Sequence, residues 1–249
     1  MTDHVLVSQT GGVCELRLNR PEKRNAITID MYDALWDAIV RAEGDEAVRV
    51  ILLSGAGASF TAGNDLGDFL NAPPTGQERG PVRFLRLLPK IRKVLMAAVH
   101  GSTVGIGVTL LLHCDLVVAA RNSRLSMPFV KLGLVPEAAS SLLLPRLVGH
   151  QRAAELLLLG TPVDSATAFN MGLVNRVVDD AVLHEEARAL AQTVAEQPAG
   201  ALRATKQLLR SETGLTARIE EELQAFQERL TSAEFKSAAQ AFLSKGRAG

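Results

Sequence analysis

Two kinds of residue between positions 97 and 145 could do chemistry together. Gly101, Gly105 and Gly107 precede an apolar helical run that we expect to end near His113, and Glu137 follows in a long loop. Glycines at the start of a helix leave backbone N–H groups open to an anion, and the helix dipole favours negative charge there. A carboxylate in apolar surroundings is a candidate general base. Together, an oxyanion site and one base can move a proton next to a carbonyl group.

A glutamate in a loop is ordinarily solvated and has no catalytic role, and this is the competing interpretation of Glu137. The immediate sequence neighbours are all apolar: Leu134, Val135, Pro136, Ala138 and Ala139. The nearest basic residues in the sequence are Lys131 and Arg146. Burial without a cation raises the pKa of a carboxyl group, which is what a base that abstracts a weakly acidic carbon proton needs.

A second glycine-bearing loop, Phe60 to Asp65, resembles the loop from Thr103 to Gly107 in its place along the chain. Either loop alone would be read as a tight turn. Each follows a continuous apolar run typical of a strand buried on both faces, 48–53 and 94–99. Consecutive strands could place both loops at one sheet edge, where two backbone N–H groups would hold a carbonyl oxygen that becomes an enolate. Loss of one such donor typically costs roughly 3–4 kcal/mol of transition-state stabilisation.

Other chemical motifs do not fit the sequence. Gly55 and Gly57 suggest a dinucleotide fingerprint, but its third glycine would fall at Phe60, and no helix is expected to begin there. There is no phosphate-binding G-x-x-x-x-G-K-[ST] loop and no G-x-S-x-G elbow around a serine. The adjacent residues 113–115 (His-Cys-Asp) have no second cluster with metal-ligand spacing elsewhere, so we expect no metal.

Composition argues for a globular protein of the cytoplasm. The 249 residues are 47% hydrophobic and 22% charged, with 27 basic and 27 acidic side chains, so no net field attracts nucleic acid or an anionic membrane. Cys14 and Cys114 cannot form a disulfide framework and fit a reducing compartment. We expect no signal peptide, no membrane span and no peroxisomal address.

Hydrophobic periodicity predicts an α/β core followed by helices. In the first half we expect a hairpin around Gly11-Gly12, a helix capped by Thr28 that runs to Ala42, a helix from Val82 to Lys93, and strands at 48–53, 94–99 and 115–120. In the second half we expect short helices at 151–159 and 165–171, a strand at 173–178, and long helices at 181–196, 199–211 and 216–243. We expect the segment 68–80, rich in Asn, Pro, Thr and Gly, to be a mobile excursion.

Four segments in order resemble the crotonase superfamily, also called the enoyl-CoA hydratase/isomerase family, and the resemblance covers essentially the whole chain. They are NRPEKRNAI at 19–27, VILLSGAGASFTAGNDL at 50–66, MAAVHGSTVGIGVTLLLHCDLVVA at 96–119 and PRLVG at 145–149. The resemblance implies an α/β fold made of a spiral of ββα units (residues 1–195) with a helical C-terminal trimerisation region (196–249). It also implies an acyl-CoA thioester as substrate, and a homotrimer or dimer of trimers.

The resemblance assigns roles to particular residues. In the family two backbone N–H groups form the oxyanion hole, and these map onto Asn64 and Ile106. In the family the adenine and phosphates of coenzyme A are bound by the backbone that corresponds to residues 60–66 (FTAGNDL) and by basic residues after the first hairpin. The residues that match are Lys23, Arg24, Ala26, Ala62, Gly63, Asp65 and Leu66. For Lys23 and Arg24 a solvated turn is the competing interpretation.

The chain departs from the hydratase pattern at two positions. Hydratases carry two glutamates that activate water, and the corresponding residues here are Thr109 and Phe129. Glu137 stands where many hydratases have glycine, an arrangement that looks like delta-3,delta-2-enoyl-CoA isomerases of the peroxisomal type. We therefore expect an isomerase in which Glu137 transfers a proton from C2 to C4 of a 3-enoyl-CoA, without a metal or redox cofactor.

Two alternatives stay open at this point. One is enoyl-CoA hydration or another crotonase-type reaction on an acyl-CoA. The other is a non-catalytic acyl-CoA-binding subunit that kept the fold. The segment 68–80 is expected to border the acyl pocket, but its composition specifies no chain length.

Overall fold

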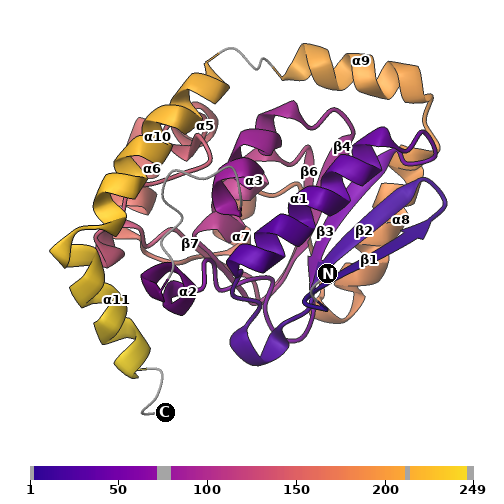
Figure 1. Ribbon diagram of the computed structural model, residues 1–249. Coiled ribbons are helices and arrows are strands. Elements are labelled where there is room, and N and C mark those ends of the chain that lie inside the picture. Colours follow the sequence, from indigo (N-terminus) through magenta and orange to yellow (C-terminus); the bar gives the residue numbers. More distant parts are fainter. Residues whose placement is uncertain (1–2, 72–79, 211–213, 246–249) are drawn as a thin grey trace.

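A six-stranded sheet forms the centre of the computed structural model, which describes residues 3–71, 80–210 and 214–245 (Figure 1). Its strand order is β1-β2-β3-β4-β6-β9, in which only the β1–β2 pair is antiparallel. The bounds are β1 Val5–Thr10, β2 Val13–Leu18, β3 Val50–Gly55, β4 Val94–Val99, β6 Leu116–Ala120 and β9 Arg176–Val178. The hairpin around Gly11-Gly12 and the expected strands are confirmed to within a few residues at their ends.

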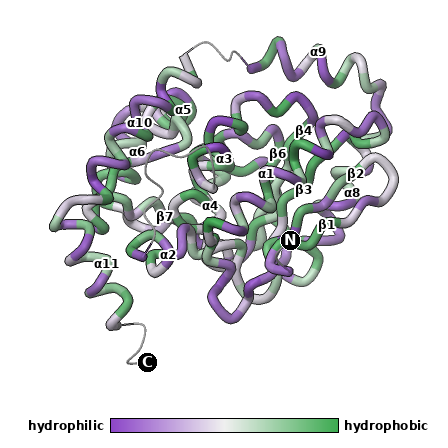
Figure 2. Tube along the Cα trace, in the orientation of Figure 1, coloured by the Kyte–Doolittle hydropathy of each residue, from purple (hydrophilic) through white to green (hydrophobic). Residues whose placement is uncertain are grey.

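The sheet centre is hydrophobic on both faces because helices cover both sides. Ile51, Leu95 and Val117 belong to a large core on one face, which also holds α1 (Ile29–Gly44) and α3 (Pro81–Leu87). The alternate residues Leu52, Met96 and Val118 instead pack with α8 (Leu183–Ala195). Side chains of a strand alternate between the two faces of the sheet. Because both faces are covered here, these strands appear in the sequence as continuous apolar runs. Figure 2 shows β3 and β4 as largely hydrophobic segments in the middle of the fold.

Helix α1 begins where the sequence predicts. The Thr28 side chain accepts a hydrogen bond from the Met31 N–H at 3.2 Å, which satisfies one of the unpaired donors of the first turn. Its buried face includes Met31, Leu35 and Ile39, as the helical spacing indicates. The expected helix from Val82 to Lys93 is shorter than predicted: α3 ends at Leu87 and a 3₁₀ turn, Leu88–Lys90, follows. Pro89 has no N–H to continue the α-helical ladder.

A small second sheet was not predicted. It consists of β5 (Ser102–Val104), β7 (Arg124–Ser126) and β8 (Val163–Asp164). These strands are two or three residues long, too short for an alternating pattern to identify them. After β5 the apolar run forms α4 (Ile106–Thr109) and a 3₁₀ turn, η3 (Leu110–His113).

The segment expected to be a mobile excursion contains a short helix, α2 (Leu66–Asn71), at its start. Residues 72–79 of the expected excursion lie outside the described part of the chain.

The second half is mostly helical, as expected, with two corrections. Helix α5 (Ser140–Val148) follows Glu137 directly, within a stretch expected to be loop. The single helix expected over 216–243 is two helices, α10 (Leu215–Leu230) and α11 (Ala233–Lys245). A break at 231–232 separates them, and the Ser232 hydroxyl accepts a hydrogen bond from the Phe235 N–H at 3.2 Å. A side-chain acceptor of this kind favours a new helix start over a continued helix.

The remaining elements of this half agree with the expected pattern. They are α6 (His150–Ala154), a π-helical turn Glu155–Leu159, α7 (Ser165–Asn170) and α9 (Ala199–Leu209). Further 3₁₀ turns lie at Pro21–Lys23, Val130–Leu132 and Asp180–Val182. Helices α10 and α11 run along one side of the molecule, next to α2, α3 and α5, whereas α9 lies at its periphery (Figure 1). The C-terminal helices therefore flank the end of the core that carries Glu137 and α5.

Candidate active site

The two glycine-bearing loops lie side by side. Thr61 and Thr103 form a parallel β-bridge, and the Val104 N–H donates to the Thr61 carbonyl at 3.0 Å. Gly63 approaches the next loop so closely that a Cβ atom on it would lie 2.9 Å from the Val104 carbonyl oxygen. Its φ of +88° is also a conformation that suits glycine. The predicted meeting of these loops at one sheet edge is confirmed.

The backbone N–H groups of Asn64 and Ile106, the candidate oxyanion donors, lie on these two loops. Around Asn64, the neighbouring bonds run from the Ile27 N–H to the Gly63 carbonyl and from the Asp65 N–H to the Ile27 carbonyl, so the Asn64 N–H points away from Ile27. Ile106 is the first residue of α4, where an N–H group has no partner within the helix. Within the described ranges neither N–H has a protein acceptor. Both can therefore donate to an oxygen placed between the loops.

Glu137 lies next to this pair of loops. Its side chain is buried, and its Oε1 accepts a hydrogen bond of 2.5 Å from the Thr109 hydroxyl. Thr109 is one helical turn after Ile106 in α4. The hydrogen bond thus links the carboxylate to the short helix that begins at Ile106. The candidate base and one donor of the candidate anion site are therefore both attached to α4.

The pKa of Glu137 is raised from its ordinary value of 4.5 to about 8. Desolvation by burial is the main cause, because an ionised carboxylate loses its hydration there. The Thr109 hydrogen bond acts in the opposite direction, and the negative charge of Glu222 on α10 adds to the increase. At neutral pH this carboxyl is mostly protonated, and its anion is a much stronger base than an exposed glutamate.

The backbone around Glu137 is unusual. Ala138 and Ala139 have φ values of +62° and +53°, in the left-handed region that side chains disfavour. His113 supports the turn, since its Nε2 lies 2.7 Å from the Ala138 carbonyl oxygen. Burial lowers the pKa of His113 to about 3, so the ring is neutral and Nε2 donates this bond. Turns of this kind persist only when surrounding contacts hold them.

Tyr32 is a site residue that the sequence did not indicate. It is the single tyrosine of the chain and is fully buried on α1, with its hydroxyl donating a short hydrogen bond to the Asn64 side-chain oxygen. Burial is the main cause of a pKa well above 10 for Tyr32, and the charge of Glu137 contributes. In the sequence Tyr32 follows Met31 on a predicted helix, where an aromatic residue reads as core. No local signal could have placed it beside Asn64.

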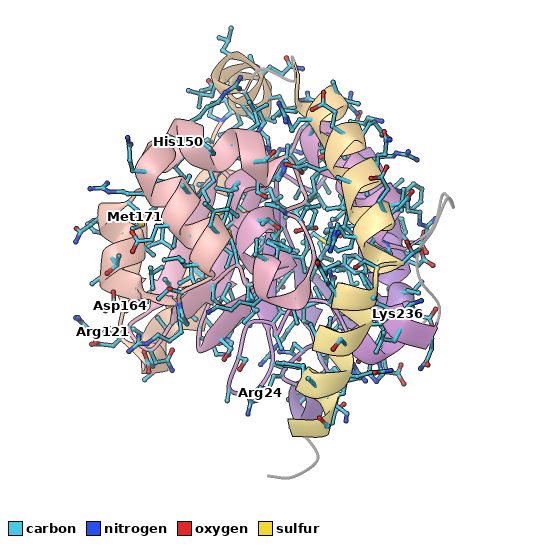
Figure 3. All side chains as sticks on the ribbon, turned by 90° about the vertical axis from the view of Figure 1, so that its left-hand side faces the viewer. Arg24, Arg121, His150, Asp164, Met171 and Lys236 are labelled. Atoms are coloured by element: carbon cyan, nitrogen blue, oxygen red, sulfur yellow. The ribbon has the colours of Figure 1, made fainter. Side chains whose placement is uncertain are left out.

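The residues that the resemblance assigns to coenzyme A lie together where the 20–26 turn packs on the 61–66 loop. The Ala62 N–H donates to the Arg24 carbonyl at 2.8 Å, and Arg20 Nη1 forms an ion pair with Asp65 Oδ2 at 2.6 Å. Lys23 and Arg24 are exposed, and Figure 3 shows the Arg24 side chain at the surface. Their ammonium and guanidinium groups are available for phosphates.

The other assigned residues differ in what they can offer a ligand. Asp65 already binds Arg20, and that carboxylate is therefore not a free ligand group. Ala26 and Leu66 are half-buried, with Leu66 the first residue of α2. Ala62 and Gly63 contribute backbone only. Phe129 is 4% exposed and carries no carboxylate. At the two positions where hydratases bear glutamates, this chain therefore has a buried phenyl ring and the hydroxyl of Thr109.

The described part of the chain offers neither a metal site nor a membrane-spanning helix. It contains no cluster of three or more His, Cys, Asp or Glu side chains suited to a metal ion. None of its helices is long and apolar enough to cross a membrane.

The fold and this site define the crotonase class: a spiral α/β core in which two loops present backbone N–H groups beside a buried carboxylate. The family model described as enoyl-CoA hydratase/isomerase matches residues 8–249, and the chain belongs to that family. A crystal structure titled enoyl-CoA hydratase/isomerase from Pseudoalteromonas atlantica T6c has 40% identity and a TM-score of 0.93, covering 98% of both chains.

Several relatives carry isomerase names. The 1,2-epoxyphenylacetyl-CoA isomerase of Escherichia coli (strain K12) is 37% identical over 98% of this chain and 97% of its own length. Enoyl-CoA delta isomerase 2 of Rattus norvegicus is 34% identical over 97% of this chain, which spans 63% of the length of the rat protein. The protein is therefore an enzyme of the enoyl-CoA hydratase/isomerase family.

Proposed function

We propose that this enzyme isomerises a 3-enoyl-CoA to the trans-2-enoyl-CoA. The observation that carries the proposal is the buried Glu137 carboxylate, which accepts a 2.5 Å hydrogen bond from Thr109, a residue one helical turn after Ile106 in α4. The thioester carbonyl binds the N–H groups of Asn64 and Ile106. The carboxylate of Glu137 then removes a proton from C2, and the electron pair moves into an enolate whose oxygen those two donors stabilise.

The second half of the reaction uses the same groups. The enolate electrons return through the former C3–C4 double bond, C4 takes the proton from the Glu137 carboxylic acid, and a C2–C3 double bond remains. No atom is gained or lost, and the carboxylate is regenerated. A pKa of about 8 for Glu137 supports both steps, because the group is basic enough to take a carbon proton and acidic enough to return it.

Hydration is the less favoured reaction because it needs an activated water. Thr109 and Phe129 supply neither of the two carboxylates that hydratases use, and the Phe129 ring is buried. A water-poor site favours return of the proton to carbon over attack by water.

The defining experiment measures conjugation of 3-enoyl-CoA esters of several chain lengths, with Glu137→Gln beside the wild type. We expect turnover in the wild type and a loss of roughly 10²–10⁴-fold in the variant. Glu155→Gln, on an exposed glutamate, is the matched control and should retain full activity. Undiminished turnover in Glu137→Gln would contradict the assignment of the base.

A second candidate is isomerisation of an aryl-epoxide acyl-CoA, which the 37% identity with the Escherichia coli enzyme favours. Competition between a 3-enoyl-CoA and 1,2-epoxyphenylacetyl-CoA, compared by kcat/KM, separates the two. The same assay with crotonyl-CoA measures any hydration. Tight binding of all these thioesters without turnover would instead support a non-catalytic acyl-CoA-binding subunit.

Coenzyme A and subunit contacts complete the proposal. We place the phosphates of the thioester substrate near Lys23 and Arg24, and its nucleotide against the backbone of the 61–66 loop. The enzyme needs no metal or redox cofactor in this mechanism and works in the cytoplasm. The exposed Leu208 and Leu209 of α9, 89% and 83% accessible, are consistent with a homotrimer or dimer of trimers, which sedimentation velocity would measure.

A further inference from the structure

A second buried carboxylate lies near Glu137, on a helix 85 positions further along the chain. Glu222 of α10 is 7% exposed. Its Oε1 accepts hydrogen bonds from the Ser141 N–H at 2.9 Å and from the Ser141 hydroxyl at 2.5 Å. Figure 3 shows α10 and α11 along the face turned toward the viewer.

These bonds make Glu222 the cap of α5. The residue at the N-cap position of α5 is Ala139, which has no side chain able to accept from the first turn. The first N–H groups of a helix need acceptors, and a negative charge is favoured there by the helix dipole. The cap that Ser, Thr, Asp or Asn would supply locally comes instead from α10.

The same contact holds the turn that carries Glu137. Ala138 and Ala139, with their positive φ angles, connect Glu137 to α5. On one side His113 donates to the Ala138 carbonyl, and on the other side Glu222 accepts from Ser141, two residues after Ala139. A left-handed conformation is unfavourable for alanine, so two adjacent ones need such anchors to keep the turn in place.

Helix α10 is itself fixed to the core near this point. Arg86 of α3 forms a two-pronged ion pair with Glu220, with Nε–Oε1 and Nη2–Oε2 distances of 2.7 Å each. Bidentate pairs of this kind have a defined geometry. The ion pair holds α10 against α3, and the carboxylate of Glu222, two residues further along α10, is thereby held next to α5.

We propose that Glu222 is a positioning residue of the active site: its carboxylate fixes the turn that carries Glu137 and places a second negative charge beside that base. The inference rests on the role proposed for Glu137 as base. It holds for any acyl-CoA reaction that begins with proton abstraction by Glu137.

The charges around the two carboxylates come from several elements. Thr109 of α4 lowers the pKa of Glu137, whereas the charge of Glu222 raises it, and Tyr32 of α1 faces the same region as a neutral phenol. His113 is neutral because its pKa is lowered to about 3. Burial raises the pKa of Glu222 itself, and its bonds to Ser141 and the charge of Arg218 oppose the increase.

The test uses Glu222→Gln and Glu222→Ala in the full-length enzyme. The glutamine keeps a carbonyl oxygen for the Ser141 N–H but removes the charge, so the pKa of Glu137 should fall by roughly one unit. The alanine also removes the acceptor, so turnover at saturating substrate should fall by roughly tenfold or more. Glu221→Gln, on the neighbouring surface residue, should change neither quantity.

The titration of Glu137 can be read without any substrate. The infrared carbonyl band of its protonated carboxyl is isolated by subtracting the spectrum of Glu137→Gln and followed against pH in each variant. This readout separates failure of the present inference from failure of the proposed reaction, since it needs no turnover. The rate at which the C2 proton of an acyl-CoA exchanges with deuterated solvent measures proton abstraction in the same variants.

The positioning role is supported if the titration midpoint of Glu137 lies at lower pH in Glu222→Gln than in the wild type but is unchanged in Glu221→Gln. An unchanged midpoint in Glu222→Gln, with unchanged exchange in Glu222→Ala, would overturn it. If Glu222→Ala does not fold, the comparison of Glu222→Gln with Glu221→Gln decides alone.

Discussion

The Thr109 hydroxyl lies 2.5 Å from Glu137 Oε1 and ties the loop carboxylate to helix α4. Ile106, whose N–H is a candidate oxyanion donor, begins the same helix one turn earlier. One hydrogen bond thus links the candidate base to half of the candidate oxyanion site. Thr109 occupies a position where hydratases bear a catalytic glutamate, and here its hydroxyl serves another carboxylate.

Replacement of Thr109 by valine should move the pH dependence of catalysis upward. The hydroxyl bond lowers the pKa of Glu137, so its removal raises that pKa further above 8, by roughly half a unit to one unit. The rise of kcat/KM with pH, measured between pH 6 and 10, should shift by the same amount. Thr109→Ser retains the hydroxyl and should keep the wild-type profile; equal profiles for Thr109→Val and wild type would contradict the assignment.

Glu137 should make the folded enzyme less stable as pH rises. Its pKa is about 4.5 unfolded and about 8 folded, so between these values the folded state holds a proton that the unfolded state has lost. Stability contributed by this proton is complete below pH 4.5 and is lost progressively up to about pH 8. Glu137→Gln should match the wild type in urea unfolding at pH 5 and exceed it by a few kcal/mol at pH 9. Equal free energies of unfolding at pH 9 would show that the carboxyl is not desolvated.

Replacement of Tyr32 by phenylalanine should weaken the oxyanion site without harming the fold. The ring keeps its contact with Phe84, with centroids 5.3 Å apart, but the hydroxyl that orients the Asn64 side chain is lost. We expect kcat/KM to fall roughly tenfold, since a hydrogen bond is worth about 1–1.5 kcal/mol and the backbone N–H itself remains. If the bond acts through Asn64, Tyr32→Phe in an Asn64→Ala background should have little further effect. Additive losses would place Tyr32 in another role.

The close approach of the two loops can be tested at two glycines with similar positive φ angles. Gly63 and Gly149 have φ values of +88° and +83°, but a Cβ atom contacts the Val104 carbonyl only at Gly63 and meets nothing within 4 Å at Gly149. Either alanine variant should lose about 1–3 kcal/mol of unfolding free energy from backbone strain. Only Gly63→Ala should also lose activity, because it pushes the loops apart. Equal activity of the two variants at a temperature where both are folded would argue against the loop pair as the oxyanion site.

If Lys23 and Arg24 contact the phosphates of coenzyme A, their replacement should change substrate binding and not the rate of the chemical step. Lys23→Ala/Arg24→Ala should raise KM by roughly tenfold with little change in kcat, since two exposed ion pairs contribute about 1–1.5 kcal/mol together. A pantetheine thioester without the nucleotide should show no such difference. Arg41→Ala, at an exposed arginine of α1, controls for loss of surface charge. An unchanged KM for the coenzyme A thioester would leave Lys23 and Arg24 as solvated turn residues.

The helices and strands of the core could be predicted because their signals are local. Thr28 caps α1 as expected, and the runs at 50–55 and 94–99 are strands buried on both faces. The predictions failed where a short-range pattern carries little information. The strands of the second sheet are too short to alternate, and the helical periodicity continues across the break between α10 and α11. Helix α5 was missed because its cap comes from Glu222 rather than from a residue beside it.

The sequence alone indicated the candidate base and the candidate anion site. The apolar neighbours of Glu137 indicated a buried base, and the paired glycine loops indicated an anion site, because residue type and spacing express burial and backbone freedom directly. Tertiary structure alone decided the contacts of these groups. Thr109, Tyr32 and Glu222 come from three helices at distant positions in the chain, and no periodicity encodes which side chains such helices bring together. Their meeting depends on how the helices pack around the sheet.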